Sequence, residues 1–448
     1  MCVSMNFADR ARALAAVLVL ASMAGCGGSS TETKLVGGGL GGGTATQVNL
    51  DTPTGDNTTQ IVVDSGPQGG FSIGAVNVPY VTVSVCAPGS ATNCVTIDHV
   101  FLDTGSIGLR VFASTVAPLG LPAVQVPADA ATSTPAGRAV ECYPFVLGAV
   151  WGGVATADVR IAGELASGVP IQVIDDATPP ADAVPADCNA AANGQLMNSA
   201  ASLQANGILG IGMLAFDCGL ECTTGNYTSG YTLYYACPAG SACVPAAIPA
   251  PLQVQNPVTF FPVDNNGTIV ALPALPQLGA QTVTGRLVFG IGTRTNNQLP
   301  ATASVLFVDA NPSDAAYLYF LTTVGANAYP DSYIDSGSNA LFFDDASVPQ
   351  ACQSKSGTGA EAWYCPPSAL QRSATITGAQ ASTATVAFSV VSADALFNTP
   401  GLGFDDLAGS LAPGSKSFVW GLPFFYGRSV YTSIWGQALS PAGPWNAF

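Results

Sequence analysis

The chain has 448 residues, of which 48% are hydrophobic and only 9% are charged, with 50 Gly and 32 Pro. Because globular proteins usually carry roughly 25% charged residues, this composition argues against long amphipathic helices and coiled coils and favours a β-rich globular protein. The net charge of −16 disfavours binding to nucleic acid, whose phosphates would be repelled. With one histidine, His99, the chain has little scope for metal sites. We therefore expect no metal and no cofactor.

The N-terminus predicts export from the cytoplasm. Arg10 and Arg12 precede an apolar run at 13–21, which is short for a transmembrane helix of roughly 20 residues. The following Met-Ala-Gly-Cys, ending at Cys26, resembles a bacterial lipobox, in which the cysteine carries the lipid. The alternative is an ordinary cleaved signal peptide with an incidental cysteine. We assign residues 1–25 to a lipoprotein signal peptide and expect lipid attachment at Cys26.

Residues 26–59 are predicted to be a Gly-rich tether, because the segment 27–45 is too flexible and too poor in apolar residues to fold. A tethered domain of this kind would be lipid-anchored in the cell envelope. Gly27, and not an aspartate, follows the cysteine. By resemblance to enterobacterial lipoproteins, this disfavours retention at the inner membrane and suggests the outer membrane, on its periplasmic or surface side.

Ten cysteines follow Cys26, and an even number in an exported chain suggests five disulfides. A zinc site is the competing interpretation, but no CxxC pair or neighbouring histidine supports it. Two pairs are close enough in sequence for local bridges, four cysteines are expected to pair among themselves, and the remaining two would then pair together. These groups are Cys86 with Cys94 and Cys352 with Cys365, then Cys218, Cys222, Cys237 and Cys243, and lastly Cys142 with Cys188.

Alternating apolar and polar residues recur along the chain between Gly, Pro, Asn and Asp. This period of two is typical of strands, and clear examples lie at 76–85, 155–161, 286–289 and 383–391. Convincing helices are few and short, with 192–205 as one candidate. The pattern predicts a fold made mainly of strands.

An internal repeat is the most informative feature of the sequence. The segment VFLDTGS at 100–106 is matched by SYIDSGS at 332–338, and each is an apolar strand ending in Asp-[Thr/Ser]-Gly-Ser. Each is followed later by two apolar residues and a glycine, at 208–210 and 419–421. A single Asp-Ser-Gly is ordinary turn chemistry. Two copies in the same order indicate two related halves.

This order resembles that of the pepsin-like aspartic peptidases, whose two lobes each donate one such aspartate. The segments 206–212, 284–290 and 418–425 are similar to further conserved strands of that family. The resemblance implies an all-β, bilobal pepsin-like fold with an interlobe cleft, formed by an N-terminal lobe at 60–255 and a C-terminal lobe at 256–448. The exported form also resembles a group of proteobacterial lipoproteins carrying a domain of unknown function.

The resemblance implies that Asp103 and Asp335 form a catalytic dyad. Two carboxylates about 3 Å apart share one proton, because both cannot ionise easily. The neighbouring residues of both motifs would support the dyad through tight turns and hydrogen bonds across the lobes and to the outer carboxylate oxygens. In chain order these residues are Thr104, Gly105, Ser106, Ser336, Gly337 and Ser338.

Arg110 stands where the family usually has a tryptophan that braces a tyrosine on a β-hairpin flap. The flap is predicted at 141–163. Phe145 falls at the tyrosine position, and Tyr143 and Trp151 lie close enough to substitute for it. An arginine near the dyad would favour the doubly ionised state; it could instead face solvent or pair with an acid.

His99 beside Asp98 suggests a Ser-His-Asp hydrolase as another possibility, but the chain has no G-x-S-x-G motif. A structural or exposed histidine is the preferred interpretation. Three acidic pairs lack the spacing of an EF-hand and are expected in solvated loops. These pairs are Asp175-Asp176, Asp344-Asp345 and Asp405-Asp406.

The sequence therefore predicts an envelope-tethered aspartic endopeptidase that acts on a peptide or an unfolded protein segment. The alternative is a catalytically inactive pepsin-fold module that binds protein or peptide, suggested by Arg110 and by the uncertain flap tyrosine. The expected contacts are a peptide in the cleft and a membrane through the lipid anchor. We expect a monomer that does not bind nucleic acid.

Overall fold

The structure is a computed structural model that describes residues 47–49, 55–69, 75–146, 148–192, 194–225, 232–308, 318–350, 352 and 363–448. The predicted signal peptide, the predicted lipid-attachment residue Cys26 and most of the predicted tether lie outside the described residues. Among the described residues no helix has both the length and the apolar character needed to span a membrane.

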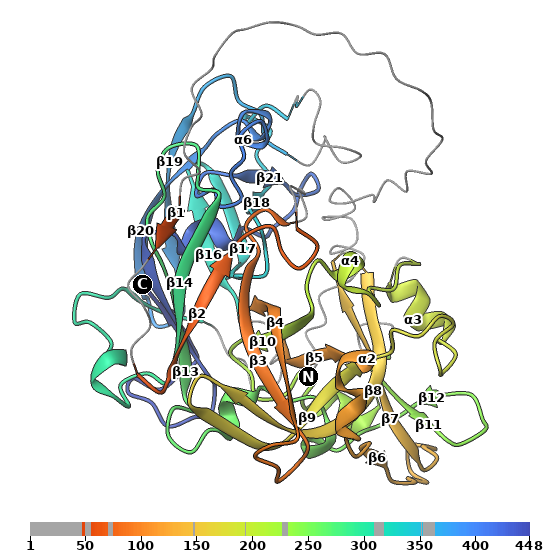
Figure 1. The fold of residues 1–448 in the computed structure, drawn as a ribbon. Helices are drawn as coiled ribbons and strands as arrows, with labels where there is room; N and C mark the ends of the chain where they lie inside the picture. The colour runs from red at the N-terminus through yellow and green to blue at the C-terminus, as the bar shows by residue number, and fades with distance from the viewer. Residues whose placement is uncertain are drawn as a thin grey trace, which may run out of the picture.

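The chain is mainly β, as predicted, with two large sheets and a few short helices (Figure 1). The larger sheet contains β1 (Gln47–Asn49), β2 (Thr58–Val63), β3 (Pro79–Cys86), β4 (Cys94–Asp103), β5 (Ile107–Phe112), β6 (Gln125–Val126), β7 (Gly137–Phe145), β8 (Gly148–Ile161), β9 (Glu164–Ile174), β10 (Gly207–Ile211), β11 (Tyr234–Cys237), β12 (Val244–Pro245), β13 (Gly267–Leu272), β14 (Thr282–Phe289), β15 (Val305–Phe307), β23 (Arg428–Ser433) and β24 (Trp445–Ala447). The smaller sheet contains β16 (Phe320–Val324), β17 (Asn327–Ile334), β18 (Leu341–Phe343), β19 (Leu370–Thr377), β20 (Thr383–Val390), β21 (Ala408–Ser410) and β22 (Val419–Trp420). The α-helices of the described residues are α2 (Ala113–Val116), α3 (Ala186–Ala191), α4 (Ala200–Leu203), α5 (Leu220–Thr224) and α6 (Ala393–Phe397).

The prediction of one helix over 192–205 is wrong. Helix α3 ends before this segment, and α4 covers only four residues of it. Gly194 has a φ of +75°, which favours glycine and ends helical geometry. Ser199 then caps the start of α4, because its side chain accepts a hydrogen bond from the Ser202 amide.

One strand arrangement, made of three pairings, occurs in both halves of the chain. In the first half β4 lies parallel to β10, β10 antiparallel to β5, and β5 parallel to β9. In the second half β17 lies parallel to β22, β22 antiparallel to β18, and β18 parallel to β21. The same connectivity therefore surrounds each copy of the sequence repeat.

A glycine in each repeat permits this packing. A Cβ on Gly210 would lie 2.6 Å from the Ile107 nitrogen, and one on Gly421 would collide with the Ser338 and Ala340 carbonyl oxygens. Real Cβ atoms essentially never approach so closely. The glycine of each apolar-apolar-Gly element is thus required because the element crosses directly against the loop that follows the aspartate.

Strands from both halves share the larger sheet. Strand β2 pairs with β3 on one side and with β14 on the other, and β13 pairs with β14 and β23. Figure 1 shows β2 and β14 side by side although more than 200 residues separate them. The two halves are therefore joined by backbone hydrogen bonds as well as by side chains.

Asn77 forms a second junction between the halves. Its side chain donates to the Asn339 and Phe404 carbonyl oxygens at 2.9 and 2.8 Å, and it accepts from the Phe404 amide and the Tyr426 hydroxyl at 2.8 and 2.9 Å. The residue is 1% exposed. All the hydrogen-bonding groups of this buried amide are used, as burial of a polar group requires.

The five predicted disulfides are confirmed, including the two local bridges and the pairing of Cys142 with Cys188. The remaining four cysteines do pair among themselves, Cys218 with Cys222 and Cys237 with Cys243. Every cysteine between residues 86 and 365 is therefore part of a disulfide bond.

We predict that the Cys142–Cys188 bridge stabilises the fold more than the Cys218–Cys222 bridge. Their sequence separations are 46 and 4, and closing a longer loop removes more entropy from the unfolded chain, giving about 4 and about 2 kcal/mol in the chain-entropy model. Both cysteines of each bridge are buried, so the pairs are matched for lost packing. Guanidinium unfolding of the two double-alanine variants measures the difference. Equal losses of unfolding free energy would contradict this account.

Candidate active site

The two repeated motifs bring Asp103 and Asp335 together. Asp103 is the last residue of β4, and its strand register places it beside Gly210 of β10. Asp335 directly follows β17, and its amide donates to the Trp420 carbonyl oxygen at 3.0 Å. Both aspartates therefore sit at the carboxyl end of a central strand, each held by the apolar-apolar-Gly element of its own half.

The glycines of the motifs allow the loops to face each other closely. A Cβ on Gly105 would lie 2.6 Å from Oδ1 of Asp335, and one on Gly337 would collide with Oδ1 of Asp103. Each glycine amide also donates to the aspartate of its own loop, at 2.8 Å for Asp103 and 2.7 Å for Asp335. Each carboxylate is thus enclosed between its own loop and the loop of the opposite half.

Thr104 and Ser336 join the loops by reciprocal hydrogen bonds. The Thr104 amide donates to the Ser336 hydroxyl at 3.0 Å, and the Ser336 amide donates to the Thr104 hydroxyl at 2.9 Å. The Ser336 hydroxyl also donates to the Leu102 carbonyl oxygen at 2.8 Å. Both side chains are buried. This network fixes the spacing between the two aspartates from beneath.

The serines that end the motifs differ in their contacts. Ser338 donates from its hydroxyl to Oδ2 of Asp335 at 2.7 Å, as expected for a bond to the outer carboxylate oxygen. The Ser106 hydroxyl is buried and has no hydrogen-bond partner among the described residues, so the corresponding bond to Asp103 is not formed. The two halves of the site are therefore chemically unequal.

The electrostatic environment of Asp335 is a further asymmetry of the site. Burial raises the pKa of Asp335 to about 8, and both the charge of Asp103 and a hydrogen bond with it act in the same direction. The bonds from Ser338 and from the Gly337 amide act in the opposite direction. Asp335 therefore holds a proton at neutral pH and shares it with Asp103, as expected for two carboxyl groups in contact.

Arg110 is fully buried and pairs with two acids. Its Nη2 lies 2.9 Å from Oε1 of Glu141 and 3.2 Å from Oδ2 of Asp217, and its Nη1 donates to the Ile107 carbonyl oxygen at 2.5 Å. All three charged side chains are inaccessible to solvent. Of the alternatives left open by the sequence, the structure shows the arginine paired with acids.

This buried ionic cluster holds one more acid than base. Burial raises the pKa of Asp217 well above its usual value, the charge of Glu141 raises it further, and Arg110 opposes the shift. The Tyr234 hydroxyl donates to both carboxylate oxygens of Asp217, at 2.8 and 2.9 Å. Arg110 therefore compensates the buried carboxyl group of Asp217, whose neutral form the surroundings favour.

The predicted flap is a hairpin of β7 and β8, and its three aromatic candidates lie in different surroundings. The guanidinium carbon of Arg110 lies 3.8 Å from the ring centre of Tyr143 and 5.9 Å from that of Phe145. Trp151 is opposite Cys142 in the register and packs against Tyr235. Tyr143 is therefore the aromatic residue that Arg110 braces.

Tyr143 also lies within electrostatic range of the dyad. Burial raises the pKa of its hydroxyl above the usual value, and among the acidic charges that raise it further is that of Asp103. The hairpin that carries Tyr143 is tied down by the Cys142–Cys188 bridge and by backbone hydrogen bonds of Ala149 with Gln195 and Met197. A tyrosine on an anchored hairpin thus stacks on the arginine, and the charge of Asp103 acts on its hydroxyl.

Sequence reasoning missed Glu141, Asp217 and Tyr234. Of the three, Glu141 was the easiest to predict from the sequence, because it is one of only five glutamates in the chain and stands in a strand that is otherwise mostly apolar. Such a residue needs a buried partner. Asp217 and Tyr234 carry no comparable pattern, since the fold alone brings them beside Arg110.

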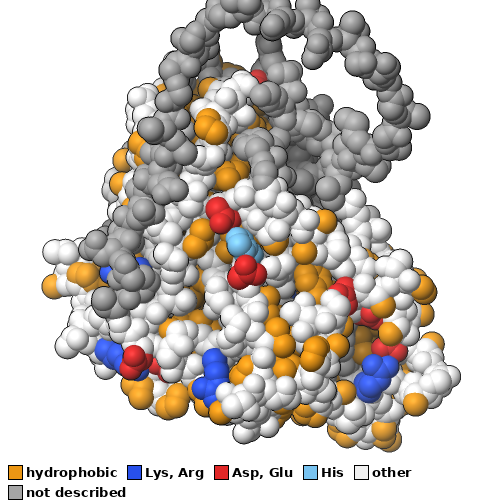
Figure 2. All heavy atoms as spheres, in the orientation of Figure 1, with side chains coloured by type: hydrophobic (Ala, Val, Ile, Leu, Met, Phe, Trp, Pro, Cys, Tyr) orange, Lys and Arg blue, Asp and Glu red, His pale blue; other side chains and the backbone are white. Residues whose placement is uncertain are grey.

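Other candidate groups stay apart from this site. His99 lies between Asp98 and Asp64, at 3.2 and 3.4 Å, and is partly exposed. Figure 2 shows the pale-blue imidazole flanked by acidic side chains on a face with few other charges. The two Cys/Asp groups close enough to surround an ion, among the described residues, both use disulfide cysteines, which are unavailable as thiolate ligands.

A protein-family model matches the chain over nearly its whole length. Residues 53–448 match the model of a protein of unknown function, DUF3443. The chain belongs to this family. No curated protein matches the chain. The matched region includes both aspartate loops, the buried ionic cluster and the hairpin, so these features all lie within the family domain.

We predict that Arg110→Met strongly destabilises the fold, because it removes the cation that faces two buried carboxyl groups. Breaking a buried ion pair costs about 3–5 kcal/mol. The control is Arg138→Met, which removes a pair with Asp182 that is partly exposed and contributes about 0–1 kcal/mol. Thermal and chemical unfolding measure the loss of unfolding free energy in both variants. The deficit of Arg110→Met should shrink as the pH falls through the raised pKa of Asp217, because the neutral carboxyl group no longer needs the cation. A deficit no larger than that of Arg138→Met would rule out this role.

Proposed function

We propose that the chain is an aspartic endopeptidase of pepsin-like fold, tethered in the cell envelope by the predicted lipid at Cys26. The observation that carries this proposal is the pair Asp103 and Asp335, enclosed between two loops that are joined by the Thr104–Ser336 bonds. The repeated strand connectivity around these loops supports the bilobal pepsin-like arrangement. A peptide or an unfolded protein segment would occupy the space between the lobes.

The two carboxyl groups have different tasks in this reaction. Asp103 acts as the base and takes a proton from a water molecule, whose oxygen attacks the peptide carbonyl carbon. Asp335, whose pKa is raised to about 8, gives its proton to the carbonyl oxygen, so a neutral gem-diol forms. Asp335 then recovers a proton from one diol hydroxyl while Asp103 delivers its proton to the nitrogen, and the carbon–nitrogen bond breaks.

Arg110 is compatible with this chemistry because its charge is compensated within its own cluster. Glu141 and Asp217 both contact the guanidinium, so the cation does not act as the counter-ion of the dyad. Its flat face instead braces Tyr143. A cation over an aromatic ring is a favourable contact, and it would perform the bracing role for which the pepsin-like family uses tryptophan.

We predict that Asp103→Asn and Asp335→Asn each abolish cleavage of a denatured-protein substrate while the fold persists. Removing a general acid or base lowers the rate by about 10²–10⁴-fold. Asp98→Asn, an exposed aspartate on the same strand as Asp103, serves as the control and should retain full activity. Thermal unfolding checks the fold of each variant, and a statine-type inhibitor should block the wild type. An inert wild type with a bound peptide would instead indicate the binding module.

The pH dependence provides a separate test. Activity should fall as the pH rises through the pKa of Asp335, about 8, because the acid form is lost. Since the hydroxyl of Ser338 lowers this pKa, Ser338→Ala should move the alkaline limb of kcat/KM to higher pH. Ser106→Ala is the matched control, because the Ser106 hydroxyl makes no such bond, and it should leave the limb in place. Identical shifts in both variants would contradict the assignment of the acid to Asp335.

The same pKa has a consequence for stability. A carboxyl group whose pKa is higher in the folded than in the unfolded chain stabilises the fold at low pH, and this contribution is lost as the pH rises towards the folded value. Asp335 should therefore lose its contribution between about pH 4 and about pH 8. Unfolding curves of the wild type and Asp335→Asn across this pH range measure the contribution of Asp335 to the free energy of unfolding. The variant should show a smaller decline in stability than the wild type.

A further inference from the structure

Outside the dyad, three charged side chains meet where the first half of the chain contacts the second. Glu164 begins β9, next to the turn that joins β8 to β9. Asp264 precedes β13, and Arg294 follows β14. Arg294 contacts both acids, because its Nη2 lies 2.9 Å from Oε1 of Glu164 and its Nε lies 2.6 Å from Oδ2 of Asp264. We call Glu164, Asp264 and Arg294 the carboxyl cluster.

The two acids of the carboxyl cluster are buried. Glu164 is 6% exposed, and Asp264 is inaccessible to solvent. Oδ1 of Asp264 accepts a hydrogen bond from the Thr293 hydroxyl, while Oδ2 contacts Arg294. The loop that follows β14 therefore occupies both oxygens of this carboxyl group. A buried charge is costly unless it is paired and hydrogen-bonded, and here one cation serves two carboxyl groups.

A proton completes the carboxyl cluster. A side-chain hydrogen bond joins Glu164 to Asp264, and such a bond requires a proton on one of the two carboxyl groups. Burial raises the pKa of Glu164 to about 7, and both the bond with Asp264 and its charge act in the same direction, whereas Arg294 opposes the shift. With this proton the cluster holds one cation, one anion and one neutral acid. Without it, two carboxylates face one cation.

The charged groups around the cluster come from four segments of the chain. The β8–β9 hairpin supplies Glu164, the segment before β13 supplies Asp264, and the loop after β14 supplies Arg294. The segment before β2 supplies Asp56, whose charge acts on Arg294 and whose carbonyl oxygen accepts from the Gly163 amide at 2.6 Å. Three of these four groups are acids, so ionisation of Glu164 adds like-charge repulsion at this contact.

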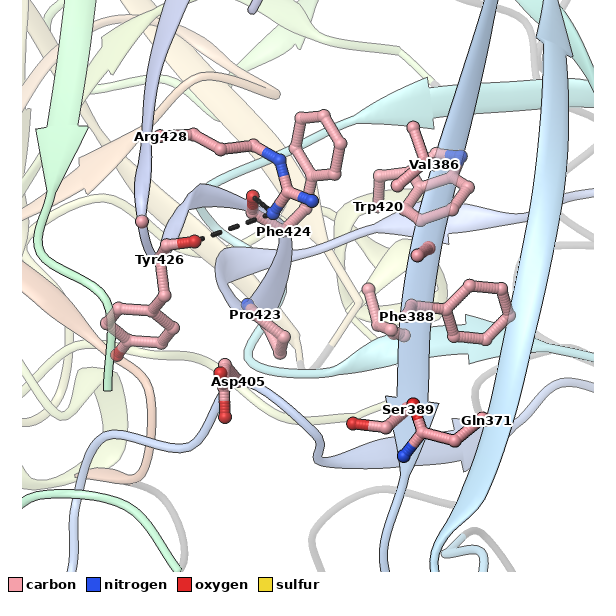
Figure 3. Close-up of a pocket in the computed structure, with 13 residues that line it drawn as sticks. Gln371, Val386, Phe388, Ser389, Asp405, Trp420, Pro423, Phe424, Tyr426 and Arg428 are labelled. Carbon is pink, nitrogen blue, oxygen red and sulfur yellow. Dashed lines mark hydrogen bonds between the residues drawn. The ribbon is translucent and has the colours of Figure 1, made fainter. Parts of the chain in front are cut away.

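Arg428 shows how an arginine is held without a carboxyl partner. Its Nη1 donates to the Phe424 and Tyr426 carbonyl oxygens at 2.7 and 3.5 Å, as Figure 3 shows. In the described part of the chain no carboxylate lies within ion-pair distance of this guanidinium. Arg428 therefore holds its own segment, whereas Arg294 joins segments from both halves.

We propose that the carboxyl cluster is a pH-sensitive contact, which holds the β8–β9 hairpin against the second half of the chain while Glu164 keeps its proton. Loss of this proton leaves two adjacent carboxylates, so the contact weakens and the hairpin opens more often. This proposal concerns the fold and does not depend on the proposed peptidase activity.

The size of the effect follows from the pKa of Glu164 in the closed and the open hairpin. An exposed glutamate has a pKa of about 4.3, and the closed contact raises it to about 7. A carboxyl group whose pKa is raised stabilises the closed form at low pH, and this contribution is lost as the pH rises towards the raised value. Between about pH 5.5 and about pH 8, the equilibrium constant for opening should therefore increase about 30-fold.

Amide hydrogen exchange of the full chain tests the proposal, with rates corrected for the intrinsic effect of pH. The reporter is the Gly163 amide, which lies in the β8–β9 turn and donates to Asp56. The internal control is the Gly378 amide, which donates to the Ser382 carbonyl oxygen at 2.9 Å in a turn where residues 377–383 carry no charged side chain. Protection of Gly163 should fall about 30-fold over this pH range, while that of Gly378 stays constant. Equal changes at both amides, or no change at Gly163, would overturn the proposal.

Two acid variants identify the group that titrates. Glu164→Gln should make the protection of Gly163 independent of pH, because a glutamine side chain donates to Asp264 at every pH. Asp158→Asn is the matched control, since Asp158 is a buried acid of β8 that accepts from two backbone amides, and it should keep the wild-type pH response. If Glu164→Gln also keeps that response, another group titrates and the proposal is wrong.

Two arginine variants test the direction of the shift. Because Arg294 lowers the pKa of Glu164, Arg294→Met should move the midpoint of the change in Gly163 protection to a higher pH. Arg428→Met removes an arginine that contacts no carboxylate in the described part of the chain, and it should leave the midpoint in place. A midpoint that falls or stays unchanged in Arg294→Met would contradict the proposed contact.

Discussion

The close approach of two carboxyl groups is the constraint on which the rest of the structure depends. Two like charges at short range are unfavourable unless a proton is shared and the surroundings hold both groups in place. The structure supplies the second condition through the reciprocal Thr104–Ser336 bonds and the amides of Gly105 and Gly337. The larger sheet, which strands of both halves share, and the buried amide of Asn77 then maintain the relation between the halves that carry these loops.

The two halves repeat one connectivity, but the site they form is asymmetric. Ser338 binds Asp335, whereas Ser106 leaves Asp103 without the equivalent bond. The first half also contains a buried ionic cluster beside its loop, around Arg110. A structural repeat thus supplies the frame, while a few side chains give the two carboxyl groups different environments. Different environments are what allow one group to act as acid and the other as base.

The sequence predicted the parts of the fold that local patterns record. Alternation located strands such as 383–391, which the structure places in β20 almost residue for residue, and cysteine spacing gave the disulfide pairing. The repeat identified Asp103 and Asp335 because each carries its own strand and glycine. The partners of Arg110 were missed, because Glu141 and Asp217 lie 31 and 107 residues away from it and meet it only through tertiary folding.

Asn77 also has a consequence for the order in which the molecule is built. Its hydrogen-bond partners lie 262 to 349 residues further along the chain, and β2 pairs with a strand more than 200 residues away. Contacts of such long range form late and slowly. During synthesis, the first half emerges without the residues that complete it. The facing loops therefore cannot assemble until nearly the whole chain is present, so any activity of this site is delayed until the protein has left the machinery that made it.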